Sequence, residues 1–407
     1  MNKWMFPFLV PQSASLQNKT GPAVATALWL ILLTAVGILI ARNPYDSTVT
    51  DYYNNASAHW FAGQPLYGGG HMAMNYLPHY AIIFSIFHFL PRVTGEILWR
   101  VFNVAVLASG VWRWTKLLMG EPAARVYAWI TPAIIPLCAA AVRNGQANTL
   151  LGGLMLHAAF SLATRKWWSA ALLIWLAAIA KPVAVVLALL TPFVYKPLRL
   201  PLLATLVIVA AFPFFFGKPA YVIAEYRAFA ANMSDCATVS EYDYADLTGI
   251  LDPLHIRLQP RVSLCIRALA GFAALVFWLL GARRLDAPLR AFFLYSLAAA
   301  YLMVFNPMNE SNSYVIFAPA PAIWAAWFLD RSPRGWRGWL FAFMVLSMGL
   351  LPNIVRRWFG NKFALCYHPS MTILFLAVLV SWVLAQRKPA ENENGNFYST
   401  AIERTGE

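Results

Sequence analysis

The sequence predicts an all-α membrane protein, a polytopic bundle of about twelve transmembrane helices. Apolar residues make up 60% of the chain and charged residues 12%, whereas soluble domains are about 45–50% apolar and about 25% charged. The apolar residues lie in long blocks, such as 23–41, separated by short polar segments. A block of roughly 18 or more apolar residues can cross a bilayer as a helix, whereas an open sheet would leave backbone groups unpaired in lipid.

Each predicted span is an apolar block with polar or basic residues at its ends. The expected spans are 23–41, 97–117, 126–142, 147–163, 167–180, 182–195, 200–216, 264–282, 288–305, 313–329, 336–351 and 369–386. One apolar segment, 78–90, is too short to cross comfortably. Pro78 and Pro91 bracket it and limit helix continuation. We interpret it as a re-entrant or interfacial segment.

The basic residues indicate orientation rather than nucleic-acid binding. The net charge is +14, and the Lys and Arg residues lie mostly in short loops beside apolar blocks. If 78–90 does not cross, most of these residues lie inside, as the positive-inside rule requires. Residues 1–386 then form a single transmembrane domain with outer loops at 42–77 and 217–260. The polar stretch 387–407 is expected to be a disordered cytoplasmic tail. The outer group Arg356, Arg357 and Lys362 counts against this orientation.

The four cysteines follow no metal-binding spacing, so we expect neither a metal nor a cofactor. Cys138 lies in a predicted span. Cys236, Cys265 and Cys366 fall on the expected outer side, where a disulfide is possible.

Polar residues gather at the outer ends of the predicted spans, which suggests a site open to that side. They are Asp46, Asp51, Arg143, Gln146, Asn148, Lys181, Asn309 and Arg356. Each has a structural alternative. The two acids could cap an interfacial helix over 52–62, and the cations could snorkel to headgroups. The amides could join neighbouring helices or form loops. His157, in a predicted span, is expected to be a packed, hydrogen-bonded neutral side chain.

Three stretches resemble glycosyltransferase family 87, whose members use polyprenyl-phosphate sugars and include mycobacterial mannosyltransferases. The first is the acidic loop 51–67, followed by Asn-Tyr-Leu-Pro at 75–78. The second is Gly-Gln-Ala-Asn at 145–148, and the third is Ala-Lys-Pro at 180–182. The family's acid usually lies a few residues further from the Tyr-x-x-Ala element than Asp51 does. The second outer loop and the last spans match in hydrophobic outline alone.

The resemblance implies an inverting transfer of a sugar, mannose or another hexose, to a hydroxyl of a glycan or glycolipid. The donor would be a polyprenyl phosphate among the membrane lipids. The site would face the periplasm or exterior of a bacterial inner membrane. A carboxylate must take the acceptor's proton, and cations must stabilise the leaving phosphate. The expected base is Asp51, then Asp46; the phosphate ligands are Lys181 and Arg143, with Arg356 or Arg357 behind them. Gln146, Asn148 and Asn309 are the expected sugar ligands.

Two other classes of protein remain open. A transporter or lipid flippase would carry charged residues deep inside its spans, and here the main polar residue of that kind is His157. A lipid-linked polysaccharide polymerase or ligase would use paired arginines in a large outer loop, for which Arg227, Arg257 and Arg261 are candidates.

Overall fold

The computed structural model describes residues 14–46, 48–68, 74–237 and 244–387, and these ranges are all-helical. The predicted tail therefore lies outside the described residues, apart from Arg387. In chain order the seventeen helices of the described ranges are α1 (Ala14–Arg42), α2 (Thr50–Ala62), α3 (Pro78–His88), α4 (Arg92–Met119), α5 (Ala123–Asn144), α6 (Asn148–Ala163), α7 (Trp167–Ala180), α8 (Val185–Leu190), α9 (Arg199–Ala211), α10 (Pro219–Ala237), α11 (Leu247–Leu251), α12 (Pro260–Ala282), α13 (Ala287–Phe305), α14 (Pro319–Arg331), α15 (Trp336–Leu350), α16 (Pro352–Phe359) and α17 (Asn361–Ala385).

The chain is a multi-pass membrane protein. In the described residues, six helical segments are long and apolar enough to cross a bilayer, and up to eight if each of two bent helix pairs counts as one span. The apolar helices α6 and α7 are shorter than this. The prediction of about twelve spans counts such short helices as crossings, and it stays a prediction.

Prolines divide several of the apolar blocks. The segment 78–90 forms α3, which begins with Pro78 at its first turn, and Pro91 separates it from α4 with a bend of 119°. The predicted span 182–195 is a shorter apolar helical run, Pro182–Phe193, in which short 3-10 turns flank α8. The predicted span 313–329 consists of a 3-10 segment, Ser311–Ile316, followed by α14.

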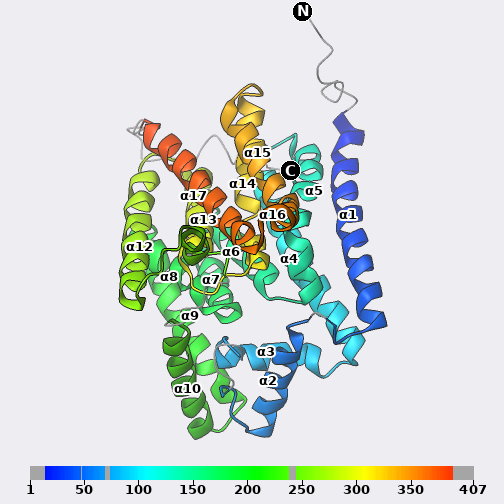
Figure 1. Ribbon diagram of the computed structural model, residues 1–407, viewed down its shortest axis with the longest axis vertical. Helices are drawn as coiled ribbons and strands as arrows, with labels where there is room; N and C mark the ends of the chain where they lie inside the picture. Colours follow the sequence, from blue (N-terminus) through cyan, green and yellow to red (C-terminus); the bar gives the residue numbers. More distant parts are fainter. Residues whose placement is uncertain (1–13, 47, 69–73, 238–243, 388–407) are drawn as a thin grey trace, which may run out of the picture.

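The two predicted outer loops contain helices that contact each other. Figure 1 shows α2, α3 and α10 together at one end of the bundle. The Glu225 side chain on α10 accepts a hydrogen bond from the backbone N–H of Leu66 at 3.0 Å. The Tyr221 hydroxyl donates to the carbonyl of Gln64 at 2.7 Å. The predicted interfacial helix 52–62 corresponds to α2, whereas the 19-residue α10 was expected as loop.

The core lies where α4, α6, α13 and α14 pack together. Trp114, Phe292 and Trp324 are fully buried there, and the rings of Trp114 and Trp324 both contact Phe292. By contrast, α12 exposes large apolar side chains such as Leu264, Leu269 and Phe272, as expected of a helix that faces lipid.

Candidate active site

A cavity of about 750 Å³ lies between segments that are far apart in the sequence. Its lining comes from α2 and the residues before it, the residues before α3, the turns after α5 and α7, α10, the residues before α11, and the segment after α13. The described lining residues are Thr48, Val49, Tyr52, Tyr53, Asn75, Tyr76, Arg143, Asn144, Gln146, Asn148, Lys181, Pro182, Val183, Met233, Cys236, Tyr244, Asn306, Pro307, Met308, Glu310 and Ser313.

Four lining side chains form a continuous hydrogen-bonded row, which we call the cavity row: Lys181, Asn148, Gln146 and Glu310. The Lys181 amine donates to Oδ1 of Asn148 at 3.2 Å. Asn148 donates in turn to Oε1 of Gln146 at 2.8 Å, and Gln146 donates to Oε2 of Glu310 at 2.8 Å. Both amide residues are buried, whereas Glu310 is exposed. The row therefore has a cation at one end and a carboxylate at the other.

The turn between α5 and α6 fixes the two amides in place. Gly145 ends α5 with φ at +68°, a value that glycine adopts without strain. The backbone N–H of Gln146 then reaches back to the carbonyl of Ala141 at 3.0 Å, so the helix ends in a Schellman-type motif. The indole of Trp99 on α4 donates to the carbonyl of Gly145 at 2.7 Å. The amides thus stand on a turn held from both sides.

A second group of charged residues supports this turn from behind. We call Asp51, Arg92, Glu96 and Arg100 the ion cluster. Glu96 is buried and forms ion pairs with Arg92 at 3.0 Å and with Arg100 at 2.5 Å. Arg100 also donates to the carbonyls of Val142 at 2.9 Å and Arg143 at 2.8 Å. Because Arg100 binds the last carbonyls of α5, the cluster ties α4 to the end of α5.

Bases outnumber acids in the described lining of the cavity. Among the described lining residues, Lys181 and Arg143 are the two bases and Glu310 is the one acid. Burial lowers the pKa of the Lys181 amine, and the charge of Glu310 partly opposes this shift. A cationic pocket whose lysine is partly desolvated is suited to an anionic group such as a phosphate.

Neither predicted base belongs to the described lining of the cavity. Asp51 is ion-paired with Arg92 through Oδ1, and its side chain is 42% exposed. Asp46 lies 3.5 Å from Nη2 of Arg143, and both of these side chains are half exposed or more. Neither acid is among the described residues that line the cavity; Asp46 pairs with the lining Arg143, whereas Arg92, the partner of Asp51, lines a second, smaller pocket.

Two other predicted site residues lie apart from the cavity lining. The amide of Asn309 is buried and donates to the carbonyls of Met303 at 3.1 Å and Asn306 at 3.2 Å. It therefore forms the loop after α13, as its structural alternative proposed. Arg356 is exposed on α16 and is absent from the described lining.

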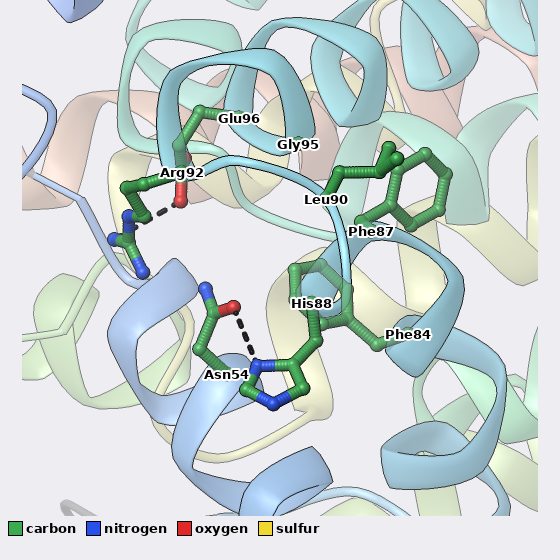
Figure 2. Close-up of a pocket in the computed structure, with 8 residues that line it drawn as sticks. All are labelled: Asn54, Phe84, Phe87, His88, Leu90, Arg92, Gly95 and Glu96. Atoms are coloured by element: carbon green, nitrogen blue, oxygen red, sulfur yellow. Dashed lines mark hydrogen bonds and ion pairs between the residues drawn. The ribbon is translucent and has the colours of Figure 1, made fainter.

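A smaller pocket of about 230 Å³ adjoins the ion cluster. Figure 2 shows Phe84, Phe87 and Leu90 along one side of it. On the other side, Nδ1 of His88 lies 3.1 Å from the amide oxygen of Asn54, and Arg92 lies beside Glu96. Most of the polar atoms of this pocket already have partners.

Three of the residues that build the site do not follow from the sequence prediction. Glu310 is a lone acid in a polar turn. The sequence feature that could have identified it as a site residue is that this turn lies on the same predicted face as Lys181. Glu96 and Arg100 have opposite charges four residues apart, the spacing that pairs side chains on one face of a helix.

His157, as predicted, is hydrogen-bonded: its Nε2 lies 3.0 Å from Oγ of Ser109.

No disulfide joins the four cysteines, all of which lie in the described chain. Cys236, Cys265 and Cys366 are free, as is the buried Cys138. Within the ranges that the structure describes, no group of three or more His, Cys, Asp or Glu residues is arranged to hold a metal ion.

The chain was compared with known protein families and with curated proteins. Residues 75–307, more than half of the chain, match the sequence pattern of glycosyltransferase family 87. The match covers the turn after α5, Lys181 and α10, and it ends three residues before Glu310. No curated protein matches the chain significantly.

Proposed function

Because the chain belongs to glycosyltransferase family 87, we propose that it moves a hexose, mannose or another, from a polyprenyl-phosphate donor to a hydroxyl of a glycan or glycolipid. The transfer inverts the configuration at C1. The observation that carries this proposal is the cavity row, which joins a cation, two amides and a carboxylate along one wall of the cavity.

Lys181 and Arg143 are the proposed ligands of the donor phosphate. When the bond from C1 to the phosphate oxygen breaks, negative charge grows on the leaving phosphate, and nearby cations stabilise that charge most in a partly dry site. Both residues line the cavity, and Arg143 can bind two phosphate oxygens in parallel. Arg356, and Arg357 next to it, are proposed as more distant contributors.

Gln146 and Asn148 are the proposed ligands of sugar hydroxyls, with Asn309 supporting the loop on the other side. A hydroxyl both donates and accepts hydrogen bonds, and an amide offers it both kinds of partner. Tyr52, Tyr53 and Tyr76 add an aromatic wall against which a sugar ring can pack.

The proton acceptor is proposed to be Asp51, with Asp46 as the alternative. In the transfer, the acceptor oxygen forms a bond to C1 while its proton passes to the carboxylate and the polyprenyl phosphate leaves. Support comes from position: Tyr52, next to Asp51, lines the cavity, and Asp46 pairs with a lining arginine. Each Asp would exchange its arginine for the acceptor hydroxyl.

The membrane arrangement completes the proposal. Residues 1–386 form one transferase domain, about twelve helices cross the bilayer, and the cavity opens to the periplasm or exterior of a bacterial plasma membrane. The polyprenyl tail occupies an apolar groove between spans. The end of the molecule that carries α2 and α10 is then the outer end.

A transporter is the alternative that one observation favours. Arg100 lies within the predicted span 97–117 and is buried with Glu96. However, the Glu96 carboxylate is paired with Arg92 and Arg100, and Arg100 also donates to backbone carbonyls, so neither is available to a moving ion. The transferase therefore remains the better proposal.

The test uses the purified full-length protein in proteoliposomes with polyprenyl-phosphate mannose, glucose or galactose as donor and an extracted envelope glycan and lipid fraction as acceptor. We expect wild type to transfer one of these hexoses. Asp51→Asn should lower the rate by about 10²–10⁴-fold, the usual contribution of a general base. Asp46→Asn and the exposed Glu121→Gln serve as comparisons.

The outcomes separate the parts of the proposal. If Asp51→Asn and Asp46→Asn both keep the full rate, the assignment of the base is wrong. Should wild type release no hexose from any of the three donors yet accumulate a solute in the vesicles, the transferase function itself is refuted.

A further inference from the structure

Glu310 stands at the open end of the cavity row, and the proposed reaction has not used it. It precedes the 3-10 segment Ser311–Ile316, and its carbonyl accepts the backbone N–H of Ser313 at 2.9 Å. The backbone around it is also held, because the carbonyl of Asn309 accepts the N–H of Ala245 at 2.7 Å. The carboxylate therefore projects from an anchored turn.

The two oxygens of this carboxylate differ in their partners. Gln146 donates to Oε2 at 2.8 Å, and Asn312 approaches the same atom at 3.4 Å. Within the described part of the chain no hydrogen bond reaches Oε1. The side chain is exposed and lines the cavity, so Oε1 can accept a hydrogen bond from a ligand.

The order of the row indicates which ligand group this is. A donor phosphate at Lys181 places the attached sugar next to Asn148 and Gln146, because these amides follow Lys181 along the wall. Glu310 comes next, at the end furthest from the phosphate along the row. A ring hydroxyl remote from C1 would meet the carboxylate there.

We infer that Glu310 binds the donor hexose by accepting a hydrogen bond from one ring hydroxyl on Oε1, and that this bond selects among hexoses. The inference rests on the proposed function and adds a determinant of sugar specificity to it. A site built to bind a hydroxyl rejects an analogue that lacks it, because the polar group is left unpaired.

The test compares the hexose donor that wild type uses fastest with four polyprenyl-phosphate donors that each lack one ring hydroxyl, at C2, C3, C4 or C6. We expect one deoxy donor to lower kcat/KM of wild type by about 10–100-fold, as for a hydrogen bond to a charged group. Glu310→Ala should lower kcat/KM for the parent donor by a similar factor and show little further loss with that same deoxy donor.

Controls separate recognition from a structural role. Glu310→Gln keeps the shape of the side chain and an oxygen that can accept, so it should retain part of the discrimination. Glu121→Ala, at an exposed acid outside the cavity, should discriminate as wild type does. If Glu310→Ala instead slows all five donors by one common factor, the inference is overturned while the transferase function stands. Absence of wild-type transfer from every donor would overturn the proposed function and the inference with it.

Discussion

The cavity row and the buried Glu96–Arg100 pair of the ion cluster are both built from charged or polar side chains, but their charges are arranged in opposite ways. In the ion cluster, Glu96 and Arg100 are each 3% exposed; the Glu96 carboxylate is paired with Arg92 and Arg100, and Arg100 also donates to backbone carbonyls. In the cavity row, the charged residues stand at the ends, with two amides between them. Charges that satisfy one another hold the structure, whereas charges kept apart remain available to a ligand.

The largest expected effect is a loss of stability, and it is expected when the buried pair of the ion cluster is disrupted. Glu96→Ala leaves the guanidinium of Arg100 buried without its main anionic partner. Removing one member of a buried pair typically lowers the free energy of unfolding by about 3–5 kcal/mol. Thermal unfolding in detergent should show this loss, and Glu121→Ala should shift stability by less than about 0.5 kcal/mol. Equal stability of the two variants would mean that the cluster does not hold α4 to α5.

In the cavity row, the expected effect falls on catalysis instead. Lys181→Ala should lower kcat/KM for the lipid-phosphate donor by about 10²–10³-fold, as when one donor to a developing anion is removed. The cost in stability should be small, because the amine makes one hydrogen bond within the described chain. If Lys181→Ala loses stability but keeps kcat/KM, the role of Lys181 is structural rather than catalytic.

The pH dependence of kcat/KM provides a second test of the role of Lys181. Burial lowers the pKa of the Lys181 amine, so the free enzyme loses this charge at a lower pH than an exposed lysine would. The alkaline decline of kcat/KM should therefore begin early in wild type. Lys181→Arg should move that decline to higher pH, since the guanidinium stays charged. An unchanged alkaline limb would contradict a phosphate role for the amine.

A smaller loss of stability is expected at Gly145, which lies between the turn that carries the amides of the cavity row and Arg100 of the ion cluster. A Cβ there would lie 2.6 Å from Cγ2 of Thr50 and 2.9 Å from Nη2 of Arg100, and the residue has positive φ. Gly145→Ala should lower the free energy of unfolding by about 1–3 kcal/mol. Gly63→Ala is the matched control, because Gly63 has φ of +66° with nothing within 4 Å. If both cost the same, crowding against Arg100 plays no part.

Most of the helices follow from the sequence, because a long apolar block in lipid leaves the backbone few choices. The difference at α10 has a clear cause. This helix is polar enough to be interpreted as loop, and its stability comes from contacts with the first outer segment, such as Glu225 with the N–H of Leu66. Such contacts between distant segments leave no local pattern.

Part of the site could also be predicted, because polar turns that follow apolar blocks are recognisable in the sequence. Arg143, Gln146, Asn148 and Lys181 sit in polar turns that follow apolar blocks, and the structure brings all four to one cavity. Polarity in a turn does not say where a side chain points, so the same reasoning did not separate the lining Glu310 from the buried Asn309 beside it.

The hydrogen bond between Gln146 and Glu310 joins residues 164 positions apart. A ribosome that has delivered the first two hundred residues to the membrane has therefore made Lys181 and both amides but not their acidic neighbour. The pocket can close only after α13 and the turn beyond it have been made and have packed against these residues. Nascent chains halted before that point should assemble much of the bundle and still be inert.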